Sequence, residues 1–149
     1  MGDLRVEAVG DEGTLRDWRY VHNLIIPTDP LSRDDVRERA GRNVLEVAHL
    51  GDAVVGCTTV RPPRDGEAVG TVIARVLPGY RGRGYGELLY ARGLARAREL
   101  GAERIRTVVL ESNPEGLRFA LAHGFVEVER YLLPGDTVPF IDLELREPA

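Results

Sequence analysis

The residue types best suited to chemistry lie in one glycine-rich segment, Arg81-Gly82-Arg83-Gly84-Tyr85-Gly86. A β-branched run over residues 71–76 precedes it and predicts a strand, and an amphipathic stretch from Glu87 to Leu100 predicts a helix. Glycines let the backbone approach a ligand closely, and the unpaired amides of a helix N-terminus carry the positive end of the helix dipole. Arg81 and Arg83 can add charge-assisted hydrogen bonds. The segment therefore predicts a site for a phosphate or pyrophosphate group.

Two common phosphate-binding loops do not fit this segment. The chain contains no lysine, so a Walker A loop, which needs Gly-Lys followed by Ser or Thr, is excluded. Gly82, Gly84 and Gly86 have the spacing G-x-G-x-G, whereas the dinucleotide loop needs G-x-G-x-x-G. Glu87 occupies the place of its third glycine. Another kind of phosphate binder, such as a nucleotide-sugar protein, stays open as an alternative.

The segment resembles the pyrophosphate loop of the GNAT acetyltransferase superfamily. That loop reads Q/R-x-x-G-x-G/A and follows a V-x-P pattern, which here is Val76-Leu77-Pro78. A second family pattern, N-x-x-A-x-x-F-Y-x-x-x-G-F, is matched at Asn113, Phe119, Gly124 and Phe125. The chain is thus similar to GNAT N-acetyltransferases in both motifs.

Periodicity and turn signals predict the element order β-α-α-β-β-β-α-β-α-β-β. The expected strands are 4–9, 44–50, 53–61, 67–76, 104–110, 125–133 and 138–146, and the expected helices are 14–26, 32–41, 86–100 and 113–123. No linker or repeat interrupts them, so residues 1–149 are expected to form one domain. The order is that of the GNAT fold, which implies an α/β architecture with a mixed six- to seven-stranded sheet and helices on both faces.

The resemblance implies that acetyl-CoA is the cofactor and that it lies in a V-shaped opening between the fourth and fifth strands. Its pantetheine arm would pair with backbone near Val76 and Leu77, with Asn113 on the other side, and its pyrophosphate would bind the amides of residues 81–86. The full expected set for acetyl-CoA is Val76, Leu77, Arg81, Gly82, Arg83, Gly84, Tyr85, Gly86, Asn113 and Phe119.

The expected reaction is direct transfer of an acetyl group from acetyl-CoA to a primary amine. The backbone amide of Leu77 is the expected oxyanion donor. Direct transfer is preferred because the single cysteine, Cys57, lies in an apolar strand pattern and is expected to be a buried core residue.

One position departs from the family pattern in a way that matters for catalysis. The tyrosine that often protonates the departing CoA thiolate falls at position 120, where this chain has Ala120. Either the thiolate leaves without that acid, or another residue such as Tyr131 replaces it, or the chain is a catalytically silent acyl-CoA sensor. The general base is also open, with Glu111 as first choice ahead of His49 and His22.

The acceptor is expected to contact the first helix pair and the last hairpin. Candidate lining residues are Trp18, Tyr20, His22, Asn23, Asp29 and Tyr131, although core packing is the better expectation for Trp18. The sequence leaves the acceptor open between a small-molecule amine and a protein N-terminus or lysine.

Net charge, apolar runs and the first residues of the chain indicate its partners and its localisation. A net charge of −4 argues against a nucleic-acid partner, and no apolar run approaches the roughly 20 residues of a membrane span. The start, Met1-Gly2-Asp3-Leu4-Arg5, lacks the apolar core of a signal peptide. We therefore expect a cytoplasmic, bacterial protein that uses no metal, with a homodimer left open as its oligomeric state.

Overall fold

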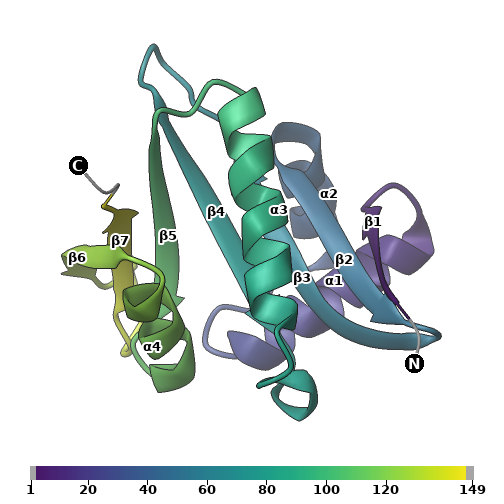
Figure 1. Ribbon diagram of the computed structural model, residues 1–149. Coiled ribbons are helices and arrows are strands. Elements are labelled where there is room, and N and C mark those ends of the chain that lie inside the picture. The colour runs from purple at the N-terminus through teal and green to yellow at the C-terminus, as the bar shows by residue number, and fades with distance from the viewer. Residues whose placement is uncertain (1–2, 147–149) are drawn as a thin grey trace.

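Seven strands form one mixed sheet in the order β1-β2-β3-β4-β5-β7-β6 in the computed structural model, which describes residues 3–146 (Figure 1). The strands are β1 Leu4–Ala8, β2 Val44–Leu50, β3 Ala53–Arg61, β4 Val69–Val76, β5 Arg104–Leu110, β6 Phe125–Tyr131 and β7 Phe140–Leu145. The helices are α1 Glu12–Ile25, α2 Arg33–Arg42, α3 Tyr85–Glu99 and α4 Pro114–Ala122, with a 3-10 turn η1 at Pro78–Tyr80. The predicted α/β class and element order are confirmed.

Side-chain caps explain where the helices begin. Ser32 caps α2 in a capping box with Asp35, and the Asn113 side chain accepts a hydrogen bond from the Gly116 amide at 3.1 Å. The predicted start of α1 was wrong by two residues. Asp11 caps that helix and forms a reciprocal pair with Thr14, so the helix begins before the apolar periodicity does.

The sheet is antiparallel except between β4 and β5. Those two strands pair over only three positions, from Val69 opposite Arg104 to Thr71 opposite Arg106. Beyond that point β4 stays paired with β3 as far as Val76, and β5 stays paired with β7 as far as Leu110. The two strands therefore diverge, as Figure 1 shows. The predicted opening between the fourth and fifth strands is confirmed.

Apolar clusters cover both faces of the sheet. On one face, α3 and α4 pack over residues such as Val72, Val109 and Phe125. On the other face, α1 and α2 pack over residues such as Val47 and Cys57. None of the described helices is long and apolar enough to cross a membrane. Met1 and Gly2, which carry part of the expectation about a signal peptide, lie outside the described residues.

Candidate active site

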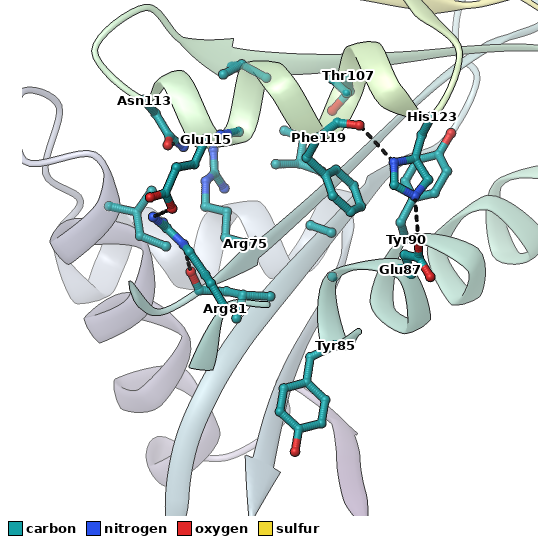
Figure 2. A pocket seen from close by; sticks show the side chains of 18 of the residues that line it. Arg75, Arg81, Tyr85, Glu87, Tyr90, Thr107, Asn113, Glu115, Phe119 and His123 are labelled. Atoms are coloured by element: carbon teal, nitrogen blue, oxygen red, sulfur yellow. Dashed lines mark hydrogen bonds and ion pairs between the residues drawn. The ribbon is translucent and has the colours of Figure 1, made fainter. Parts of the chain in front are cut away.

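A cavity of about 400 Å³ lies where β4 and β5 diverge (Figure 2). Successive side chains of a strand face opposite sides of a sheet. Ala74 belongs to the apolar cluster under α3 and α4, whereas Val108 belongs to the cluster that contains Ile26. The cavity touches residues of both clusters and is lined by Ile25, Ile26, Thr107, Val108, Phe119 and Ala120 among others. It therefore passes through the sheet from the α3 and α4 side to the α1 side.

The glycine-rich segment forms one mouth of the cavity. Gly84 is the residue before α3 and has a left-handed backbone with φ of 85°, and a Cβ atom there would meet nothing within 4 Å. The first amides of a helix have no partner within the helix. Gly82, Gly84, Tyr85 and Gly86 line the cavity beside those amides. This mouth thus has the open backbone and the amide donors that an anion needs.

Arg81 crosses that mouth. Its Nε donates to the Val76 carbonyl at 2.8 Å, and its Nη1 pairs with Glu115 Oε2 at 2.6 Å, so the side chain joins the end of β4 to α4 (Figure 2). Arg83 is exposed and lies over the Tyr80 ring, outside the cavity lining. Only one of the two arginines predicted to bind phosphate is therefore placed at the cavity in this arrangement.

The Leu77 amide is already paired. It donates to the Val55 carbonyl at 2.8 Å, which extends the ladder between β3 and β4 by one bond. An amide hydrogen in such a bond is not available for an oxyanion, so the expected role of Leu77 does not fit this arrangement. Its carbonyl is also engaged, since it accepts from the Tyr80 amide at 2.9 Å.

Side chains of α4 form the wall opposite the glycine-rich segment. Asn113, Phe119 and Ala120 line the cavity, and the first two belong to the set expected for acetyl-CoA. The Phe119 ring lies close to Gly86, because a Cβ there would be 3.2 Å from the ring, a tight contact. A glycine at this position therefore favours the close approach of α3 and α4.

Ala120 has no acidic group, but two polar side chains that the sequence reasoning missed lie near it. His123, which directly follows α4 as its C-cap, and Tyr90 of α3 both line the cavity (Figure 2). His123 contacts the Phe119 carbonyl through Nδ1 at 2.8 Å and faces Glu87 through Nε2 at 3.3 Å. Helical spacing of three residues from position 120 was the signal that could have found His123.

The two expected catalytic side chains lie outside the cavity lining. Glu111 pairs with Arg130 at 2.9 Å, on the side of β6. Tyr131 lines a separate hollow and donates to Asp142 Oδ1 at 3.1 Å. Burial, followed by the negative charge of Asp142, raises the pKa of Tyr131 to about 12. A phenol with that pKa is a weak proton donor at neutral pH.

The expected acceptor residues on α1 and after it are also placed away from the cavity lining. Trp18 is 1% exposed and donates its indole N–H to the Thr58 carbonyl, so it is a core residue. His22 stacks on Trp18 and is buried, and burial, then the charge of Arg75, lowers its pKa to about 4. Asp29 lies in the connection between α1 and α2. The residues of this region that do line the cavity are Ile25 and Ile26.

The other α1 candidates and His49 have structural partners. Asn23 exchanges two hydrogen bonds with the backbone of Leu31, which fixes the connection to α2. Tyr20 is 54% exposed on α1. His49 Nε2 contacts Asp17 at 3.0 Å between β2 and α1. These residues are therefore explained by packing and surface position without a role at the cavity.

Comparison with known proteins identifies the family. The model of the acetyltransferase (GNAT) family matches residues 13–125, so the chain belongs to the GNAT acetyltransferases. No curated protein sequence matches the chain.

Solved structures share the fold. The yncA protein of Salmonella typhimurium, solved with its cofactor acetyl-CoA, is 15% identical with a TM-score of 0.74, covering 96% of this chain and 93% of its own. A Bacillus subtilis acetyltransferase in complex with CoA is 22% identical with a TM-score of 0.67, covering 98% of this chain and all of its own. An N-acetyltransferase of Staphylococcus aureus Mu50 is 14% identical with a TM-score of 0.75, covering 97% and 98%.

Proposed function

We propose that this protein is an acetyl-CoA-dependent N-acetyltransferase that transfers the acetyl group directly to a primary amine. The observation that carries the proposal is the cavity through the sheet, with an anion-binding mouth on one face and an apolar opening on the other. Fold neighbours solved with acetyl-CoA or CoA support the choice of donor.

The residues present fit acetyl-CoA in three places. The open amides around Gly84 and Tyr85 suit the pyrophosphate, with Arg81 able to turn from Glu115 toward a stronger anion. The space between the diverging strands suits the narrow pantetheine arm. Asn113 and Phe119 supply a polar group and an apolar surface along that arm.

The reaction needs an amine nitrogen to attack the thioester carbonyl carbon, so that a C–N bond forms and the C–S bond breaks. The nitrogen loses a proton, and the sulfur gains one. A thiol has a pKa of about 8.5, so its thiolate is a good leaving group even without an acid at position 120. Cys57 offers no covalent route, because it is fully buried and burial raises its pKa to about 11.

A catalytically silent acyl-CoA sensor is the second candidate. Two observations favour it. Ala120 supplies no proton donor, and the two carboxylates of the cavity lining already have partners, since Glu87 contacts His123 and Glu115 pairs with Arg81. Neither carboxylate is a ready base in this arrangement.

Two measurements separate these candidates. Calorimetry with acetyl-CoA against ATP and NAD tests the donor, and release of free CoA thiol across a panel of amines tests turnover. We expect tight binding of acetyl-CoA alone and amine-dependent thiol release. Binding without turnover on any amine supports the sensor, and preference for ATP or NAD rejects both candidates.

A further inference from the structure

The side of the cavity that faces α1 carries a positive charge without a matching carboxylate. Arg75 of β4 is half-buried and lines the cavity (Figure 2). It lies opposite Cys57 of β3, which packs with α1 residues, so Arg75 faces the same helix. Within residues 3–146, its guanidinium forms no ion pair with a carboxylate, and its side-chain neighbour is the Cys57 thiol.

Two further arginines add to this charge. Arg61 follows Cys57 by four residues on β3, so the alternation of a strand places it on the same face as Arg75. Arg39 comes from α2, which packs over that face. Burial first, and then the charge of Arg39, lowers the pKa of Arg61. Burial first, and then the charges of Arg61 and Arg39, lowers the pKa of Arg75. We call Arg39, Arg61 and Arg75 the arginine cluster.

Several acids on this side of the sheet are occupied elsewhere or lie beyond Arg75. Asp65 and Glu67 line a separate hollow with Arg61 and Asp142, and Arg75 is not part of its lining. Glu144 pairs with Arg104 and Arg106, and Asp35 is held by Ser32 at the start of α2. Asp142 accepts the Tyr131 hydroxyl and acts on Arg61, but it is not among the charges that act on Arg75. His22 adds no anion either, since an imidazole is neutral or positive.

Burying like charges together is unfavourable unless an opposite charge joins them. A guanidinium presents paired N–H donors that match a carboxylate or another planar or tetrahedral anion. In the proposed function the donor occupies the glycine-rich mouth at the start of α3, so the amine acceptor reaches the cavity from this side. An acceptor with its own negative charge would therefore supply the missing partner.

We propose that the acceptor is a small amine that also carries an acidic group, in the manner of an amino acid, and that Arg75 binds that group. The proposal rests on the proposed N-acetyltransferase activity. Arg75 is then a residue that determines specificity. Ile25, Ile26, Val108 and Leu110 form an apolar wall beside it, which suits an aliphatic or aromatic substituent on the acceptor.

The test compares matched acceptors by kcat/KM for CoA thiol release. Each amino acid is paired with its amide, which removes only the negative charge, and taurine and 2-aminoethylphosphonate are paired with ethanolamine to distinguish the kind of anion. Because hydrogen bonds to charged groups are worth more than neutral ones, we expect the preferred acidic acceptor to exceed its neutral partner by about 10- to 100-fold. Equal or better use of the neutral partners throughout, or no turnover on any acidic amine, overturns the inference.

Variants locate the effect at Arg75. Arg75→Gln is expected to remove most of the preference for the acidic partner while acetyl-CoA affinity by calorimetry stays unchanged, and Arg75→Lys should keep an intermediate preference. The control Arg5→Gln, which removes an equal charge from the edge strand β1, should keep the full preference for the acidic partner. A preference that survives in Arg75→Gln contradicts the role of Arg75. A wild-type protein that does not bind acetyl-CoA would instead contradict the proposed function, so the two failures can be told apart.

Discussion

Burial controls which reactive side chains can act. Cys57, His22 and Trp18 are residue types that often appear in active sites, yet each is buried in the cluster between the sheet and α1 or packs against it. For Cys57 and His22 the loss of water disfavours the charged form, which raises the pKa of the thiol to about 11 and lowers that of the imidazole to about 4. Both groups are therefore neutral at physiological pH.

The first prediction concerns Cys57. Replacement by alanine should leave acetyl transfer unchanged, because a neutral buried thiol is neither a nucleophile nor a base, and should lower stability by about 1 kcal/mol through the small cavity it leaves. Turnover and urea unfolding check the two parts. A loss of turnover with acetyl-CoA binding intact would point to a covalent acetyl-cysteine route.

The second prediction concerns the acid side of the stability profile. The pKa of His22 is about 4 in the folded protein against a reference value of 6.5, so below pH 6.5 the unfolded chain binds a proton that the folded protein does not. Stability should therefore fall as pH drops from 6.5 to about 4, by about 3 kcal/mol from this residue. Urea unfolding at several pH values should show a flatter profile for His22→Gln. The control Leu24→Gln changes an exposed residue of the same helix that has no ionisable group, so it should retain the wild-type slope. An identical slope in His22→Gln would contradict the assignment.

At the scale of elements, the site depends on how β4, α3 and α4 meet. The turn at Gly84 directs the chain from β4 into α3, and Arg81 ties the same region to α4. In the proposed function, these two features would contribute separately to the binding of a pyrophosphate. One provides room and amide donors, and the other provides a charge that is held by a competing carboxylate in the free protein.

The third prediction tests the turn. Gly84→Val forces a β-branched residue into a left-handed backbone and places a side chain at the open mouth, so acetyl-CoA affinity should fall severely. Gly51→Val introduces the same kind of strain at φ of 58° in the hairpin between β2 and β3, away from the cavity. Both variants should lose about 1–3 kcal/mol of stability, but only the first should lose affinity in calorimetry. Wild-type affinity in Gly84→Val would show that the pyrophosphate binds elsewhere.

The fourth prediction tests the ion pair across the mouth. Glu115→Gln removes the competitor for Arg81, so acetyl-CoA affinity should rise by up to about fivefold, the size of a partly exposed ion pair. Glu99→Gln is the matched control. It breaks an ion pair with Arg96 on α3, and neither residue belongs to the cavity lining. Its affinity should equal that of the wild type. Weaker binding in Glu115→Gln would mean that the carboxylate itself supports the ligand.

At the scale of the whole molecule, the sequence predicted the fold better than the site. Strand alternation and helical periodicity are local signals, and the structure confirms the element order that they predict. Glu111, by contrast, directly follows β5, and it pairs with Arg130, which lies 19 residues later in the chain. Local patterns cannot carry such information.

Local sequence patterns do not predict the arginine cluster either. Arg39, Arg61 and Arg75 come from three different elements, and nothing in their spacing along the chain suggests that they act on one another. The pairing of β3 with β4 and the packing of α2 bring them together. A charge balance of this kind becomes visible only when the tertiary structure is known.

The passage through the sheet has a consequence for the order of events in catalysis. Because one mouth lies on the α3 and α4 side and the other on the α1 side, donor and acceptor need not share an entrance, and neither has to leave before the other arrives. Our fifth prediction is that initial rates at several fixed acceptor concentrations give intersecting double-reciprocal lines, as a ternary complex requires. Parallel lines, the sign of an acetylated enzyme, would contradict it. A dead-end CoA analogue should then compete with acetyl-CoA but not with the amine, so the two faces of one sheet would be distinguishable by inhibition kinetics alone.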